Sequence, residues 1–195
     1  MAYLEAAVVV YLRELYYPDG FAFPLAQIPQ PILITEIGRE IATIIMLATA
    51  AKFLAKARNE WFAFFAFNFG VWDIWYYIWL KILLDWPVSI MELDILFLIP
   101  IVWVGPVLAP VLVSTALIIA GYLILRFENI MFTRFDWVSE ILAGMIIIAS
   151  FLAQPDIIDS GQLPEDYPWI IFLIGYIIGL TVFSRRLIPA IRLKR

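Results

Sequence analysis

The sequence has 195 residues, of which 64% are hydrophobic and 15% charged, and its formal net charge is −4. A soluble domain has about 45–50% apolar and about 25% charged residues, so this composition excludes an ordinary water-soluble core and predicts a surface that largely faces lipid. Cys and His are both absent, which excludes disulfides, thiolate nucleophiles, iron–sulfur clusters and histidine ligation of haem or zinc within this chain.

The fold class expected from this pattern is all-α: a polytopic integral membrane bundle of about six transmembrane helices, forming a single domain over residues 1–195. Apolar stretches long enough for such helices alternate with turn residues along the whole chain. The helices are expected over residues 2–17, 32–56, 61–84, 107–125, 137–152 and 168–184.

The first three predicted helices differ in length and polarity. Residues 2–17 would measure about 25 Å, so a helix lying in the membrane interface is the alternative to a span. Residues 32–56 are long enough to span but carry Glu36, Arg39 and Glu40 in their first third. Residues 61–84 are rich in aromatic side chains and carry Asp73.

The segment between the third and fourth helices is the least regular. Ser89 and Glu92 fit an S-x-x-E capping box, which predicts a short interfacial or re-entrant helix over residues 89–99. Pro100, Pro106 and Pro110 interrupt the apolar run that follows, because proline breaks or kinks a helix. One long kinked helix is the alternative.

The last two helices carry few polar residues. Glu140 would lie in the first turn of the fifth helix, where the helix dipole favours a carboxylate. An acidic loop over residues 154–167 leads to the sixth helix. That helix contains Gly175 and Gly179 in a G-x-x-x-G spacing, which predicts close helix contact and a homo-oligomer interface. The basic tail over residues 185–195 is expected along the anionic cytoplasmic leaflet.

The basic residues predict an orientation. With six spans and a cytoplasmic C-terminus, most of the 13 lysines and arginines fall on the inner side, as the positive-inside rule requires. The N-terminus is then cytoplasmic too, unless the first helix does not cross. The inner set is Lys52, Lys56, Arg58, Arg126, Arg134, Arg185, Arg186, Arg192, Lys194 and Arg195.

This topology brings several ionisable residues to one layer near the outer leaflet. The candidate polar, ion or substrate cluster consists of Arg13, Glu14, Glu36, Arg39, Glu40 and Asp73. Ionisable side chains inside a membrane are costly and usually mark ion or substrate pathways. The cluster could bind a cation or relay protons, or it could be a mutually neutralised structural network, because buried charges are normally paired.

No catalytic residue, metal site or nucleic-acid partner is expected. Arg39 occupies the position three residues after Glu36 where di-iron bundles place a histidine. Cofactors are not predicted, although Phe65, Trp72 and Trp75 could contact a bound lipid, quinone or pigment.

Three functions are compatible with these features. The first is a non-catalytic subunit or assembly factor of a larger membrane complex, with other membrane subunits as partners. The second is a small transporter or channel that uses the outer-leaflet cluster for protons, cations or a carboxylate substrate. The third is an intramembrane enzyme that acts on a lipid or quinone through paired carboxylates.

Overall fold

The computed structural model describes residues 1–21, 26–98, 101–127, 130–153 and 166–192. Six helices and one β-hairpin account for most of these residues. The elements are α1 (Ala2–Tyr16), α2 (Gln30–Leu54), α3 (Arg58–Leu84), β1 (Leu93–Phe97), β2 (Trp103–Pro106), α4 (Leu108–Arg126), α5 (Arg134–Phe151) and α6 (Trp169–Arg192).

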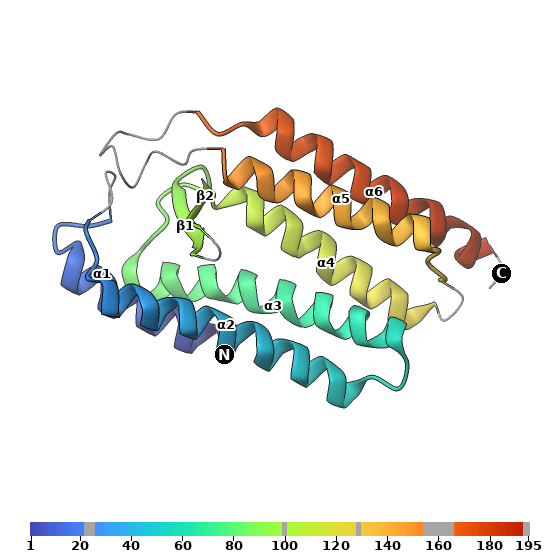
Figure 1. Ribbon diagram of the computed structural model, residues 1–195, viewed down its shortest axis with the longest axis horizontal. Coiled ribbons are helices and arrows are strands. Elements are labelled where there is room, and N and C mark those ends of the chain that lie inside the picture. The colour runs from blue at the N-terminus through green and yellow to red at the C-terminus, as the bar shows by residue number, and fades with distance from the viewer. Residues whose placement is uncertain (22–25, 99–100, 128–129, 154–165, 193–195) are drawn as a thin grey trace.

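The helices form an elongated bundle in which each lies roughly along the long axis (Figure 1). Both α1 and α2 pack on α3, α3 packs on α4, and α5 pairs with α6. The hairpin lies at one end of the bundle, beside the start of α4, and its strand β2 also contacts α5. The expectation of an all-helical bundle is therefore correct except for this hairpin.

In the part of the chain that the structure describes, two helices, α4 and α6, are long and apolar enough to cross a membrane by length and composition. In the other long helices charged or aromatic residues interrupt the apolar sequence, as Glu36, Arg39 and Glu40 do in α2. At 15 residues, α1 is about 22 Å long, shorter than a hydrocarbon core of about 30 Å.

The helix expected over residues 89–99 is wrong, and so is its alternative of one long kinked helix. The segment forms β1, which pairs antiparallel with β2. Ser89 and Glu92 make a turn instead: the Ser89 hydroxyl accepts from the Met91 N–H and the Glu92 carboxylate from the Val88 N–H. The same local hydrogen bonds that can cap a helix can also close a turn.

The ends of α5 and α6 differ from the predicted ends. Thr133 and Asp136 form a capping box, so α5 begins at Arg134 and not near residue 137. Much of the segment expected to be a basic tail is helical, because α6 continues through Pro189 to Arg192. The acidic residues Asp156, Asp159 and Glu165 and the basic residues Lys194 and Arg195 lie outside the described residues.

Glycines allow the closest helix contacts. A Cβ at Gly70 of α3 would lie 2.5 Å from the Ser114 carbonyl oxygen of α4, and a Cβ at Gly175 of α6 would lie 2.7 Å from the Ala143 carbonyl oxygen of α5. Gly179 also faces Ala143. The G-x-x-x-G pair therefore serves a contact within the chain, and a homo-oligomer interface at this pair stays a prediction.

The outer faces of the bundle are apolar. Large side chains are exposed along α2, α5 and α6, including Ile34, Ile45, Ile141, Ile170 and Ile177. By contrast, many of the buried side chains are polar or charged. The buried charges and the large apolar exposure both depart from the pattern of a soluble protein, in which charged side chains face water.

Candidate functional site: an acidic cavity beneath the hairpin

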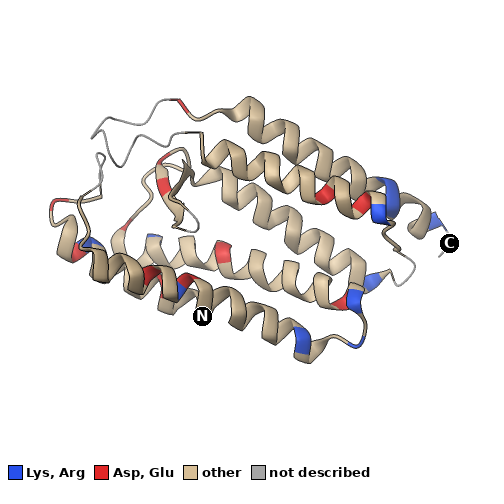
Figure 2. Cartoon of the chain, viewed as in Figure 1, with Lys and Arg blue, Asp and Glu red and all other residues tan. Residues whose placement is uncertain are grey.

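Seven elements, α1 to α5 and both strands of the hairpin, surround a cavity of about 330 Å³. Its charged lining comes from Glu5 and Arg13 of α1, Glu36, Arg39 and Glu40 of α2, Asp73 of α3 and Asp94 of β1. Apolar and aromatic side chains form most of the remaining wall. Figure 2 shows these charges along α1, α2, α3 and the hairpin, far from the basic residues at the opposite end.

Arg39 joins α1 to α2. Its Nε donates to Glu36 Oε2 over 2.8 Å, and its Nη1 pairs with Glu5 Oε2. The second oxygen of Glu5 accepts from the Thr43 hydroxyl. One guanidinium is therefore shared by two carboxylates, and both of them are buried.

Arg13 joins α1 to the hairpin. Its guanidinium lies 3.5 Å from Asp94 Oδ1 and stacks over the rings of Trp86, at 3.9 Å, and Phe21, at 4.5 Å. The Tyr77 hydroxyl donates to the other Asp94 oxygen over 3.3 Å. Burial raises the pKa of Asp94 to about 6, and the neighbouring Arg13 opposes this rise.

Glu40 and Asp73 bind neutral partners. Both Glu40 carboxylate oxygens accept from the backbone N–H of Leu98, over 3.1 and 3.0 Å, which holds the end of β1 against α2. Asp73 accepts from the Ser114 hydroxyl of α4 over 2.7 Å. Neither carboxylate forms an ion pair with any residue that the structure describes.

The cavity is consequently acidic. Its lining contains five carboxylates and two guanidiniums, a formal excess of three negative charges when all are ionised. Carboxylates confined in a low-dielectric wall attract a cation strongly, because water screens them little. The arrangement can therefore hold a positively charged group.

Two indole N–H groups also lie in the cavity wall. Trp72 Nε1 and Trp103 Nε1 are buried and have no hydrogen-bond acceptor among the described residues. Phe97 lies between the two rings, 6.5 Å from Trp72 and 5.4 Å from Trp103. A buried donor without a partner costs free energy, so these indoles would favour a bound molecule that carries an acceptor.

Most of the predicted cluster meets in this cavity. Arg13, Glu36, Arg39, Glu40 and Asp73 all line it. Glu14 does not, because it lies on the exposed face of α1.

The partners within the cluster were predicted less well. Arg13 pairs with Asp94, which lies outside the predicted cluster. Of the three aromatic candidates, Trp72 lines the cavity, whereas Phe65 stacks on Trp61 away from it and Trp75 is exposed on the outer face.

Sequence reasoning missed two carboxylates. Glu5 is not in the predicted cluster, although its place one helical turn before Val9 on an apolar helix is a usable signal. Asp94 was assigned to a surface helix, and only the hairpin brings it to Arg13. A lone acidic residue in the apolar run after Glu92 could have indicated a buried role.

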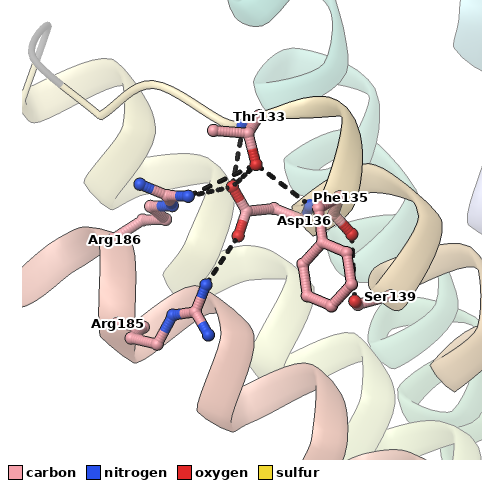
Figure 3. Close-up of polar contacts among 6 residues, drawn as sticks. All are labelled: Thr133, Phe135, Asp136, Ser139, Arg185 and Arg186. Carbon is pink, nitrogen blue, oxygen red and sulfur yellow. Dashed lines mark hydrogen bonds and ion pairs between the residues drawn. The ribbon is translucent and has the colours of Figure 1, made fainter.

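A second polar cluster joins the other ends of α5 and α6 (Figure 3). Asp136 is fully buried and lies 2.6 Å from Arg186 and 3.3 Å from Arg185. Its Oδ2 also accepts from the Thr133 backbone N–H, over 2.7 Å, and from the Thr133 hydroxyl. These bonds lower the pKa of Asp136 to about 2, the Thr133 hydroxyl contributing most. This cluster links the ends of α5 and α6, and both oxygens of the Asp136 carboxylate have partners.

Groups of three or more acidic side chains arranged to hold a metal ion are not found among the described residues. A scan against protein-family models matched no family, and searches of curated proteins and of solved structures returned no similar chain. The functional argument therefore rests on the geometry of the cavity.

Proposed function

We propose that the chain is a multi-pass membrane protein that carries a small organic cation, bound in the acidic cavity. The membrane part of the proposal rests on the apolar outer faces of α2, α5 and α6 and on the length of α4 and α6. In a bilayer these faces contact lipid tails, whereas in water they would form an aggregation-prone surface. Lipid contact also explains why the charged groups lie inside the bundle.

The basic end of the bundle supports a cytoplasmic orientation for that end. Lys52, Arg58, Arg126 and Arg134 lie at or near helix ends, and Figure 2 shows basic residues gathered at the end of the bundle that carries the C-terminus. Positive charge favours the cytoplasmic side. The acidic cavity and the hairpin then lie toward the opposite face of the membrane.

The observation that carries the proposal is the unbalanced charge of the cavity. Arg39 neutralises one of its two carboxylate partners, and Arg13 neutralises Asp94. Glu40 and Asp73 face the same space and bind only neutral donors among the described residues. A cation between them would supply the missing positive charge, and the aromatic wall would add cation–π attraction.

Transport, rather than a purely structural role, is favoured by the hairpin. Among the described residues, the side-chain hydrogen bonds between the hairpin segment and α2 are those from the Leu98 N–H to Glu40, so the residue that would bind the cation also holds the hairpin in place. A cation on Glu40 would compete with this N–H, which couples occupancy of the cavity to the position of the hairpin.

The two other functions expected from the sequence receive less support. A role as subunit or assembly factor of a larger complex would use the exposed apolar faces, but lipid accounts for those faces equally well. An intramembrane enzyme would use the same cavity, so cation binding is the property to test first.

The test is uptake of radiolabelled butylammonium into liposomes that contain the purified protein. Glu40→Gln keeps an oxygen that can accept from the Leu98 N–H but removes the charge, and it should lower uptake at least about tenfold, since a charged hydrogen bond contributes about 1.5–3 kcal/mol. Glu14→Gln is the matched control, because Glu14 lies outside the cavity on an exposed face of α1. Equal uptake by wild type, Glu40→Gln and protein-free liposomes would refute the proposal.

A further inference from the structure

A second cavity lies next to the acidic one, between α4 and the α5–α6 pair. It measures about 280 Å³ and is lined almost entirely by apolar side chains, among them Leu117 of α4 and Leu180 of α6. Glu140 is its charged lining residue, and it lies one helical turn after Asp136, toward the basic end of the bundle. The rest of the wall can accommodate a hydrocarbon chain.

The two cavities share a wall. Val113 of α4 and Gly144 and Ile147 of α5 line both of them. A Cβ built on Gly144 meets no atom within 4 Å, so the backbone of α5 borders open space at this point. Gly144 has no side chain, so a ligand chain that passed beside it from the acidic cavity to the apolar cavity would meet no side chain at that position.

The acidic side of this junction carries the two indole donors. Trp72 and Trp103 line the acidic cavity, and Trp103 stacks on Phe151 of α5, 6.1 Å away. From the acidic cavity to the second cavity, the lining therefore changes from carboxylates and indole N–H donors to mostly apolar side chains. This order matches a molecule with a cationic head, a hydrogen-bond acceptor and an apolar tail.

We infer that the ligand of this protein is an amphiphile, whose cationic amine head binds in the acidic cavity while its hydrocarbon chain passes Gly144 into the second cavity. The inference rests on the proposed function and adds the chemical class of the ligand to it. Charge complementarity favours the cationic head, and the shared lining of the two cavities at Gly144 favours an apolar tail. An ester or amide carbonyl near the head would accept from the indole N–H groups.

Gly144→Leu tests the path of the tail. The leucine side chain would fill the junction without clashing with the fold, because the space around the Gly144 Cβ is open. Gly38→Leu is the matched control: Gly38 also lies within a helix, a Cβ there also meets no atom within 4 Å, and it lines neither cavity. Butylammonium and decylammonium serve as short and long probes for binding to the purified full-length protein.

Butylammonium should bind equally to wild type, Gly144→Leu and Gly38→Leu, since its short chain stays in the acidic cavity. Decylammonium should bind Gly144→Leu at least about tenfold more weakly than it binds the other two proteins, since each buried methylene contributes about fourfold in affinity. Each probe also partitions into detergent, but this partition is the same for every variant. It therefore does not affect the ratio of the affinities that two variants show for the same probe.

A photolabel provides a readout that does not depend on a variant. Decylammonium with a diazirine at the end of its chain should label residues of the second cavity, such as Leu117 and Leu180. Labelling only of outward-facing residues such as Ile174, or an equal affinity of decylammonium for Gly144→Leu and Gly38→Leu, would overturn the inference. Absence of binding by butylammonium as well would instead refute the proposed function.

Discussion

Gly70 lies at the closest approach of α3 and α4, and replacing it with alanine tests the packing that positions the acidic cavity. A Cβ at this residue would lie 2.5 Å from the Ser114 carbonyl oxygen and 2.8 Å from Ile118 Cγ1, whereas ordinary contact begins at 3.4 Å. The oxygen belongs to the backbone and cannot rotate away. The two helices must therefore separate by almost 1 Å.

The expected cost follows from two opposing effects. Alanine stabilises a helix relative to glycine by about 1 kcal/mol, whereas overpacking a tight contact costs about 1–3 kcal/mol and sometimes more. Because the clash here is with backbone, the cost should lie at the upper end of that range, and subtracting the helix gain of about 1 kcal/mol leaves a net loss of about 1–2 kcal/mol in the free energy of unfolding. Gly38→Ala, where the added Cβ meets nothing within 4 Å, should instead gain up to about 1 kcal/mol.

Denaturant unfolding of the detergent-solubilised protein, followed by tryptophan fluorescence, measures both variants. The clash also displaces Ser114, whose hydroxyl donates to Asp73, so Gly70→Ala should weaken butylammonium binding while Gly38→Ala leaves it unchanged. If Gly70→Ala is as stable as Gly38→Ala, the close approach of α3 and α4 is not as described and the reasoning fails.

Two further predictions concern the charged groups. Arg39→Met leaves the buried carboxylates of Glu5 and Glu36 without a cation, and the free energy of unfolding should fall by about 3–5 kcal/mol. Adding Glu5→Gln and Glu36→Gln should recover part of this loss. A thermal midpoint that Arg39→Met does not change would show that the ion pairs contribute nothing to stability. The lowered pKa of Asp136, about 2 against 3.8, adds stability that is complete well above pH 3.8 and is lost as the pH falls through about 2. The thermal midpoint of wild type should therefore exceed that of Asp136→Asn at neutral pH and approach it in acid, and a gap that stays constant with pH would contradict the role given to Arg186.

The helices could be predicted from the sequence because each is an apolar stretch closed by strong turn residues. Pro18 and Gly20 follow α1, and Asp85 to Pro87 follow α3, where the expected ends lie close to the observed ones. The hairpin could not be predicted in the same way. A five-residue apolar strand such as β1 has no periodicity that separates it from a short helix, and the capping-box pattern at Ser89 favoured the wrong alternative.

The acidic site was predicted in part for a physical reason. Ionisable groups in an apolar helix must face the interior, so Glu36, Arg39, Glu40 and Asp73 could be placed together from topology alone. Their partners depend on the three-dimensional path of the hairpin, which brings Asp94 to Arg13. That path is set by contacts between residues distant in the sequence, and no local pattern encodes it.

Calorimetric titration of the purified protein with butylammonium tests the central claim most directly. The acidic cavity predicts saturable binding of one cation per chain, weakened at least about tenfold by Glu40→Gln and unchanged by Glu14→Gln. Binding that is absent, or that responds equally to both substitutions, would contradict the assignment of the cavity as a cation site.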